Sequence, residues 1–224
     1  ARPATHLGEG ARPDRQAGLP HPTPAVLGQI ELPGSGVLKH DNSDLFAKLN
    51  VRYAALDRVD DFSTMWDVCC GDGYMYEHLY RSRFSTGVYV DKRDDVPVRE
   101  GWNYRRADAQ EWLLEQTCAP AFVDIDPYGT CLALFDAVMR CCTRQHVVIA
   151  FHDMNMACVK QGDARELAYR YAGSRIRDRA WYEAEGHQVV LSGIAGSHGY
   201  ATSHYTCTPS GFNMNGYVVC SKSA

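Results

Sequence analysis

Short apolar runs alternate with segments of helical periodicity over most of the chain, from about residue 65 onward. Apolar runs bounded by turn residues predict strands at residues 65–70, 86–91, 103–108, 121–126 and 146–153. Apolar residues three and four positions apart predict helices at residues 74–83, 109–117, 131–142, 164–173 and 176–186. This alternation is typical of an α/β protein with a mostly parallel sheet.

The two ends of the chain depart from this rhythm. Residues 1–36 are rich in proline, glycine and alanine without periodicity, so we predict a disordered or extended arm, followed by one domain over residues 37–224. An amphipathic helix is expected at residues 44–59, capped by Asn42 or Ser43. Residues 187–196 and 212–221 predict an antiparallel strand pair that completes a seven-stranded sheet, joined by a polar tract that suits a functional loop at 193–211.

Bulk composition narrows the class of protein. The 224 residues suit one domain with extensions, and 45% hydrophobic and 22% charged residues are ordinary for a soluble globular chain. Because no apolar run approaches the ~20 residues of a membrane span, we expect no membrane insertion. The formal net charge of -4 neither requires nor excludes nucleic-acid binding, since a local basic patch would suffice.

The cysteines predict a reducing compartment. Nine are present, including the adjacent pairs Cys69-Cys70 and Cys141-Cys142, and no CxxC pair indicates a zinc site. An odd number on apolar segments is a poor disulfide framework, so we expect buried thiols, a cytoplasmic location and no metal. Arginines in the N-terminal arm would also suit an organellar presequence, but its acidic residues and prolines argue against one.

A glycine turn follows the first predicted strand, in the segment Asp67-Val-Cys69-Cys-Gly71-Asp72-Gly73. Glycines there allow a tight turn and a close approach to a ligand at the carboxyl ends of the strands, although a purely structural turn explains two glycines equally well.

Acidic residues end the next two strands and strengthen the case for a nucleotide-like cofactor. Asp91, followed by Lys92, can accept both hydroxyls of a ribose. Asp108 can receive an adenine amino group while Ala109 offers its backbone N–H, and Asp67 would face the amino-acid end of the ligand. Each acid alone is more simply a solvated strand end, but their joint register favours a site.

This order of motifs resembles motifs I to III of the class I S-adenosylmethionine-dependent methyltransferases, with Cys69 in place of the first glycine. The resemblance implies a Rossmann-like fold and S-adenosyl-L-methionine as cofactor. A dinucleotide site would want a third glycine where Tyr76 stands, which makes NAD the weaker alternative. The cofactor-binding residues expected are Asp67, Cys69, Gly71, Asp72, Gly73, Asp91, Lys92, Asp108, Ala109 and Asp124.

The fourth strand ends in Asp124-Ile-Asp126-Pro127-Tyr128-Gly, which predicts the acceptor site. Transfer to an exocyclic amine needs hydrogen-bond acceptors that aim the nitrogen lone pair at the methyl group. Asp126 and the carbonyl near Pro127 can each take one N–H, and Tyr128 can stack on a base. A strand-terminating turn is the simpler structural interpretation of the same residues.

This segment resembles the D/N-P-P-Y/F motif of amino-methyltransferases, and more closely the motif of the N2,N2-dimethylguanosine tRNA methyltransferases. The resemblance implies that Asp126 orients the amine, Pro127 supplies a backbone contact and Tyr128 forms an aromatic wall. It implies tRNA processing and RNA binding, with RNA a better candidate than DNA and a small amine as a further possibility. We expect no room in these 224 residues for that family's C-terminal tRNA-binding domain, so the polynucleotide stays open.

Two alternatives remain open at this stage. Asp126, Asp153 and Asn155 imitate the magnesium ligands of catechol-type O-methyltransferases, which would give a metal-dependent small-molecule enzyme. A methyltransferase-like subunit without activity is the other alternative. Two further groups have solvated or structural explanations as strong as functional ones: the histidines 152, 187, 198 and 204, and the basic, aromatic helices at residues 165–182.

Overall fold

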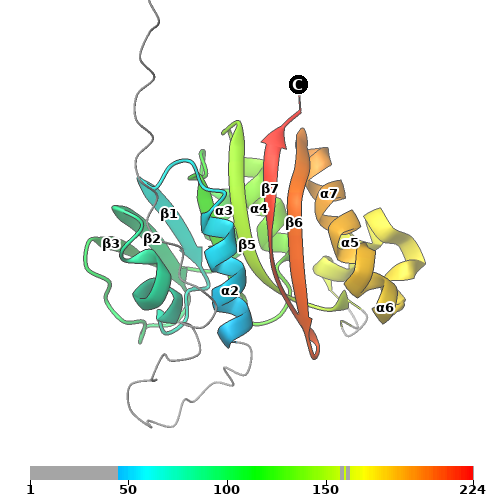
Figure 1. The fold of residues 1–224 in the computed structure, drawn as a ribbon, viewed down its shortest axis with the longest axis horizontal. Helices are drawn as coiled ribbons and strands as arrows, with labels where there is room; N and C mark the ends of the chain where they lie inside the picture. Colours follow the sequence, from blue (N-terminus) through cyan, green and yellow to red (C-terminus); the bar gives the residue numbers. More distant parts are fainter. Residues whose placement is uncertain (1–44, 157–158, 160–161, 224) are drawn as a thin grey trace, which may run out of the picture. The chain divides into compact units, whose positions relative to one another are not determined.

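A computed structural model describes residues 45–156, 159 and 162–223, so the predicted arm at residues 1–36 and the caps Asn42 and Ser43 lie outside the described residues. Seven strands form one sheet in the order β3-β2-β1-β4-β5-β7-β6 (Figure 1). The strands are β1 (Thr64–Val68), β2 (Thr86–Asp91), β3 (Trp102–Arg106), β4 (Phe122–Ile125), β5 (His146–Met154), β6 (Tyr200–Ser210) and β7 (Asn213–Lys222).

Strands β1 to β5 are parallel to one another, whereas β7 runs antiparallel to both β5 and β6. The predicted α/β class is therefore confirmed, as is the mostly parallel sheet with an antiparallel C-terminal pair. In a parallel sheet the carboxyl ends of the strands meet at one edge, which is where ligands bind in open α/β folds.

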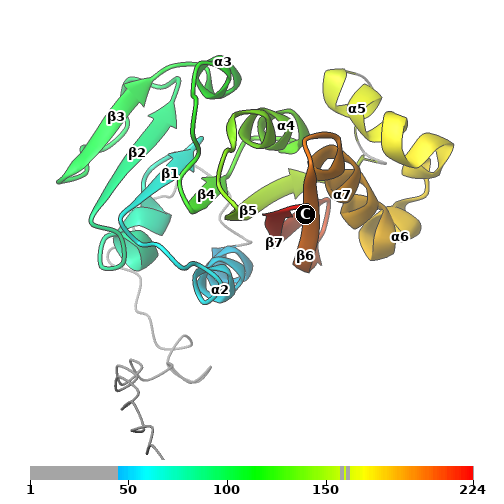
Figure 2. The same cartoon turned by 90° about the horizontal axis from the view of Figure 1, so that it is seen from above.

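Helices cover both faces of the sheet. They are α2 (Leu45–Leu56), the π-helix η1 (Tyr76–Tyr80), α3 (Ala109–Leu114), α4 (Leu132–Cys141), α5 (Asp163–Ala172), the 3-10 helix η3 (Gly173–Arg177), α6 (Arg179–Trp181), the π-helix η4 (Tyr182–Gly186) and α7 (His187–Ser197). Figure 2 shows α3 and α4 on one face of the sheet and α2 on the other. No helix among the described residues combines the length and apolar character needed to cross a bilayer.

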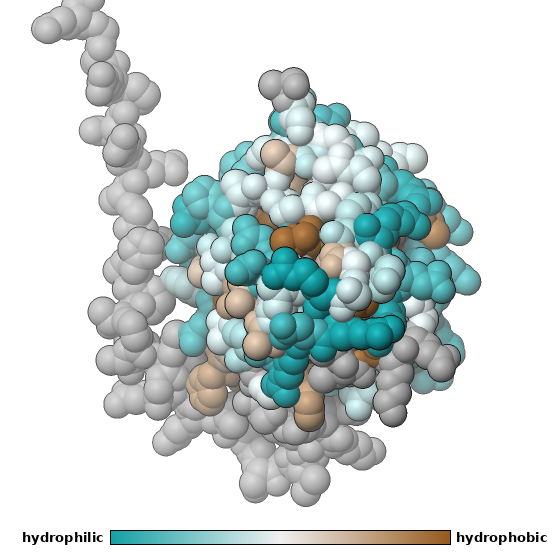
Figure 3. Space-filling model, turned by 90° about the vertical axis from the view of Figure 1, so that its right-hand side faces the viewer, coloured by the Kyte–Doolittle hydropathy of each residue, from teal (hydrophilic) through white to brown (hydrophobic). Residues whose placement is uncertain are grey.

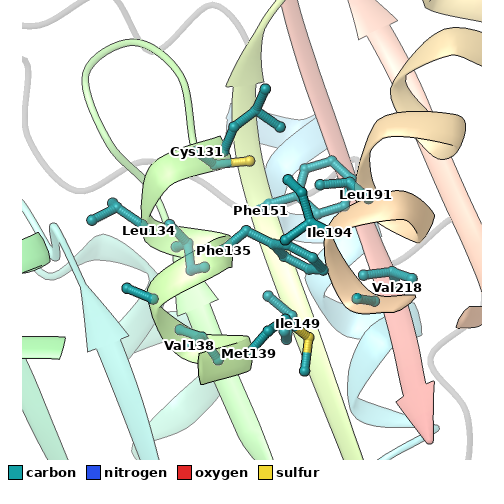
Figure 4. Packing of buried hydrophobic residues seen from close by; sticks show 14 of the residues in the cluster. Cys131, Leu134, Phe135, Val138, Met139, Ile149, Phe151, Leu191, Ile194 and Val218 are labelled. Atoms are coloured by element: carbon teal, nitrogen blue, oxygen red, sulfur yellow. The ribbon is translucent and has the colours of Figure 1, made fainter. Parts of the chain in front are cut away.

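Alternation along the central strands fills two separate apolar clusters. In β5, Val147, Ile149 and Phe151 belong to the cluster that includes α4 and α7, where Figure 4 shows Ile149 and Phe151, whereas Val148 and Ala150 belong to the cluster that includes α2. Successive side chains of a strand point to opposite faces, so a strand covered on both sides becomes a continuous apolar run. This explains why the central strands were predictable from the sequence.

The C-terminal assignment needs a correction. Residues 187–196, predicted to be a strand, form α7, and the tract predicted as a polar loop contains strand β6. The buried residues Val190, Leu191, Ile194 and Ala195 follow helical spacing, and the helix continues directly from α6 and η4. Strand β6 is an edge strand with many exposed side chains and a register shift between Ser203 and Thr206, so it lacks the apolar run of a central strand.

We expect Gly216→Ala to destabilise the fold by roughly 1–3 kcal/mol. A Cβ at this position of β7 would lie 2.4 Å from a ring carbon of Phe151 and 2.4 Å from the backbone oxygen of Thr206, which cannot move without disturbing β6. Urea unfolding of both proteins measures the loss. Gly196→Ala in α7 is the matched control, because its Cβ would meet nothing within 4 Å and helix propensity predicts a gain of up to ~1 kcal/mol. Equal urea midpoints for Gly216→Ala and Gly196→Ala would contradict the close packing around Gly216.

Candidate functional site

The ends of β1, β2 and β4 bring together the loops predicted to bind cofactor and acceptor. The three strands are neighbours and parallel, and the register pairs Val68 of β1 with both Val90 of β2 and Ile125 of β4. The N–H of Asp126 donates to the Val68 carbonyl at 3.0 Å, which extends this pairing into the loop after β4. The glycine turn, Asp91 and Asp126 therefore follow directly from the tips of adjacent strands.

Asp91 organises the glycine turn. Its Oδ2 accepts the N–H of Gly71 at 3.1 Å, and its Oδ1 accepts the N–H of Arg93 at 3.1 Å. Gly71 has a φ of 52°, and a Cβ there would meet nothing within 4 Å, so the outer side of the turn is open to an approaching ligand. A carboxylate has about four lone-pair sites, which leaves half-buried Asp91 able to accept further hydrogen bonds from a ribose.

Cys69 occupies a backbone position that normally calls for glycine. Its φ of 62° is left-handed, a conformation that costs a residue with a Cβ roughly 1–2 kcal/mol. The Cys69 N–H donates to the Val90 carbonyl at 2.8 Å. This hydrogen bond anchors the turn to β2 and stabilises the strained conformation. Burial raises the pKa of the Cys69 thiol to about 12, with the nearby Asp91 charge adding to it, so the thiol is neutral at physiological pH.

Asp67 is linked to the glycine turn through Arg99. Its buried carboxylate receives a 2.5 Å hydrogen bond from Nη1 of Arg99, whose Nη2 donates to the Cys70 carbonyl at 3.3 Å. Burial raises the pKa of Asp67 to about 6, and the Arg99 charge opposes that shift. A Cβ on Gly73 would come within 3.3 Å of Arg99 Nε, so this glycine gives the guanidinium its space. The structure thus assigns Asp67 and Gly73 to the scaffold of the turn.

Arg99 is a residue that the sequence analysis missed. Its guanidinium carbon lies 4.4 Å from the ring centroid of Tyr89, 5.2 Å from that of Tyr76 and 6.0 Å from that of Trp102. A guanidinium over aromatic rings gains cation–π attraction, and the attraction is stronger when the group is desolvated. Arg99 lies in the connection between β2 and β3, where no periodicity distinguished it from a surface arginine.

Of the other predicted cofactor residues, Asp72, Lys92 and Asp108 are exposed, whereas Ala109 is buried. Asp72 pairs with Nη1 of Arg93 at 2.8 Å. Oδ1 of Asp108 caps α3 by accepting the N–H groups of Gln110 and Glu111 at 2.9 and 3.2 Å. Ala109 begins that helix, so its own N–H has no partner within the helix.

Asp124 lies away from the predicted cofactor crevice. Its carboxylate is fully buried beneath α2, where Oδ2 accepts Arg52 Nε at 2.9 Å and the Tyr80 hydroxyl at 2.6 Å. The two neighbouring strands place Asp67 and Asp124 in register, so both acids point to the α2 face. The geometry gives Asp124 a structural task in place of the predicted cofactor contact.

Asp126 is held by a second cation from the same helix. Lys48 Nζ lies 2.8 Å from Oδ1 and 3.0 Å from Oδ2, and Arg52 Nη2 lies 3.8 Å from Oδ2. Burial by itself would raise the pKa of Asp126, but Arg52 and Lys48 lower it below its usual value, so the carboxylate is ionised. Its side chain keeps 20% exposure, in contrast to Asp124.

Helix α2 matches the spacing of these acids. Lys48 and Arg52 are four residues apart, which is about 6 Å along a helix, and Asp124 and Asp126 are two residues apart, which is about 6.6 Å along a strand. The sequence analysis missed both cations. The available signal was two basic residues in line with the apolar stripe of α2, where buried Leu45 and Leu49 flank Lys48.

The remainder of the predicted acceptor loop is open. Tyr128 is fully exposed, and the turn is closed by the Gly129 N–H, which donates to the Pro127 carbonyl at 3.0 Å. Gly129 has a φ of 137°, which favours glycine over residues with a side chain. The structure therefore places an ionised carboxylate and an unpacked aromatic ring within one short turn.

His152 flanks this loop from the end of β5. Its Nδ1 lies 2.9 Å from Oδ1 of Asn215, and burial lowers its pKa although the Asp126 charge opposes the shift, so the imidazole is neutral at pH 7. Asp153, the next residue, points to the opposite face of the sheet, where it contacts α4 and α7.

The magnesium alternative is therefore not supported by the geometry. Asp126 contacts α2 on one face, whereas Asp153 contacts α4 and α7 on the other. Asn155 is buried and donates to Glu183 at 3.0 Å. The three oxygen ligands proposed from the sequence are engaged with different parts of the molecule.

The basic helices at residues 165–182 form part of the face shown in Figure 3, which is largely hydrophilic. Arg175 stacks over the Trp181 ring at 4.0 Å, and Arg179 stacks over Phe212 at 5.1 Å while pairing with Glu183 at 2.7 Å. Arg175 and Arg179 thus have partners within the protein, and Arg170 and Arg177 are exposed.

Comparison with known proteins places this fold among methyltransferase structures. No protein-family model and no curated protein sequence matches the chain. The structure is similar to Trm1 from Pyrococcus horikoshii in complex with S-adenosyl-L-methionine (TM-score 0.54, 11% identity, 82% of this chain and 56% of that chain). It is similar to the N-methyltransferase NodS from Bradyrhizobium japonicum (TM-score 0.51, 9% identity, 84% and 100% of the chains).

A third similar structure is a Lactococcus lactis protein provisionally named a hemolysin (TM-score 0.55, 12% identity, 80% and 88% of the chains). The present chain thus spans little more than half of the Trm1 chain. At identities this low the likeness establishes the fold, a Rossmann-like α/β sheet of the methyltransferase type.

Proposed function

We propose that the protein is an S-adenosylmethionine-dependent methyltransferase that methylates an exocyclic amine of a nucleobase. The observation that carries the proposal is the ionised, partly exposed carboxylate of Asp126 beside the exposed ring of Tyr128, at the tip of the strand next to the glycine turn. The turn, with its open Gly71 and the carboxylate of Asp91, is the proposed cofactor site. The similarity to Trm1 and NodS structures supports this assignment.

The chemistry assigned to Asp126 is orientation. A carboxylate whose pKa is lowered is a weak base, so Asp126 is poorly suited to take the proton of the amine. It is well suited to accept an N–H hydrogen bond, because its oxygens have lone pairs beyond those used by Lys48. Fixing the amine in this way aims the nitrogen lone pair at the sulfonium methyl, and proximity supplies most of the acceleration.

The loop geometry suits a flat acceptor. Tyr128 offers a ring face without packing partners in the core, and base–aromatic stacking contributes about 1–3 kcal/mol per base. The carbonyl of Pro127 is engaged by Gly129, and a second lone pair on the oxygen remains for the other N–H of the amine. The displacement forms the new N–CH3 bond, breaks the S–CH3 bond, and yields S-adenosylhomocysteine and a proton.

RNA is the proposed partner ahead of DNA and small amines, on the resemblance of residues 124–129 to the dimethylguanosine tRNA methyltransferases. Incubation with labelled S-adenosylmethionine and separate pools of RNA, DNA and cell metabolites tests this choice. Label in the RNA pool supports it, whereas label in metabolites alone overturns the nucleobase assignment. A protein that binds no cofactor would be the inactive subunit instead.

We expect Asp91→Ala to weaken S-adenosylmethionine binding by about 10- to 100-fold, because hydrogen bonds to a charged group contribute roughly 1.5–3 kcal/mol. Isothermal titration measures the affinity of the two proteins. Asp94→Ala is the matched control, since Asp94 lies nearby with an exposed carboxylate 3.7 Å from Arg106. Equal affinity in wild type and Asp91→Ala would mean that the ribose binds elsewhere.

We expect Asp126→Ala to lower turnover at least 100-fold while cofactor affinity changes less than about threefold, since this substitution removes the oxygens that orient the acceptor and the side chain makes no cofactor contact. Single-turnover methylation and cofactor titration on the same preparation separate the two effects. Asp57→Ala, at an exposed acid just after α2, is the control for general effects of a lost carboxylate. Parallel losses of turnover and affinity would count against the assignment.

A further inference from the structure

A second group of polar side chains lies inside the apolar cluster on the opposite face of the sheet. Cys131 precedes α4, Asp153 is near the end of β5, and His187 begins α7. All three are fully buried, although the cluster around them is formed by side chains such as Phe151 and Leu191. Figure 4 shows Cys131 at the start of α4 within this cluster.

The three side chains converge on one point. The Cys131 sulfur, a carboxylate oxygen of Asp153 and a ring nitrogen of His187 all lie within 4.8 Å of one another, and His187 Nε2 is 2.8 Å from Asp153 Oδ2. Ligands at about 2.0 Å in a tetrahedral site are roughly 3.3 Å apart. Small side-chain rotations would therefore give all three atoms a common metal ion.

Charge favours an ion at this point. Among the described residues, His187 is the basic residue that contacts Asp153. Its side chain has at most one positive charge. Burying a carboxylate in an apolar cluster is costly unless positive charge and hydrogen bonds compensate it. A divalent ion with one thiolate, one carboxylate and one neutral imidazole would make the site neutral overall.

The surroundings have the arrangement expected around a metal-bound histidine. The Tyr205 hydroxyl lies 2.9 Å from His187 Nδ1, so it fixes the ring and leaves Nε2 directed at Asp153 and Cys131. Two backbone N–H groups, from Cys131 and Met154, donate to Asp153 Oδ1 at 3.0 and 2.8 Å and leave Oδ2 toward the histidine. The Tyr205 hydroxyl also donates a hydrogen bond to the sulfur of Cys207, which is a neighbouring thiol.

We propose that Cys131, Asp153 and His187 bind a zinc ion as its three protein ligands. The mixed sulfur, nitrogen and oxygen donor set is typical of zinc, whereas magnesium and calcium select oxygen alone. The ion would connect the segment after the acceptor loop to β5 and α7, because Cys131 follows Gly129 by two residues. The proposal does not depend on methyl transfer, so its test is independent of the acceptor assignment.

The wild-type chain, expressed in zinc-supplemented medium and gel-filtered, provides the direct test. We expect about one zinc per chain by elemental analysis, and competition with a chromophoric chelator should show a site tighter than micromolar. Removing the zinc should lower the melting temperature by about 5 °C or more, and adding zinc back should restore it. Less than about 0.1 zinc per chain together with no site in the competition assay would overturn the proposal and leave a hydrogen-bonded network.

Variants separate this site from the other cysteines and histidines. Cys131→Ala should lose the zinc and the chelator-induced shift in melting temperature, whereas Cys118→Ala, at an exposed cysteine, should keep both. His187→Gln and His198→Gln form a second pair, because His198 is partly exposed and contacts Asp136 away from this group. Zinc retained at full stoichiometry in both Cys131→Ala and His187→Gln would place the ion elsewhere. If a variant fails to fold, the wild-type metal content still decides the question.

Discussion

The carboxylates on one face of the central strands need positively charged partners, and the rest of this structure depends on that constraint. Asp67 and Asp124 are buried side by side, and Asp126 continues the row at the strand tip. Arg99 compensates the first, and Arg52 and Lys48 of α2 compensate the other two. Because removing one partner of a buried pair costs about 3–5 kcal/mol, these contacts fix the position of α2 on the sheet.

The same compensation decides which acids are available to ligands. Asp67 and Asp124 are shielded by the protein, whereas Asp91 and Asp126 are only partly buried at the carboxyl edge. Asp126 is the intermediate case, because its cations keep it ionised while its side chain stays partly exposed. These four residues are all aspartates, yet they differ in role. Those deeper along the strands belong to the scaffold, and those at the strand tips belong to the proposed site.

Much of the architecture was predictable because central strands and their connecting helices have strong local patterns. The five parallel strands were expected close to their observed bounds, and the loops at Gly71 and Asp126 follow strand tips as predicted. The errors lie where local pattern is weak or ambiguous. The apolar run at residues 187–196 fits a strand or a helix, and the burial that makes it α7 comes from α4 and α5. The edge strand β6 is too polar to stand out.

Side-chain partners were harder to predict than elements, since they depend on which face a residue takes and what packs there. Strand register places Asp124 with Asp67 and separates Asp153 from Asp126, and the cations that give Asp67, Asp124 and Asp126 their roles come from 32 to 78 residues away.

The group of Cys131, Asp153 and His187 follows the same logic on the other face, since its members are separated by 22 and 34 residues and meet only in the folded sheet. A register slip of one residue in β5 would exchange His152 and Asp153 and disrupt both faces at once. The apolar alternation of β5 therefore determines which polar residue each face receives.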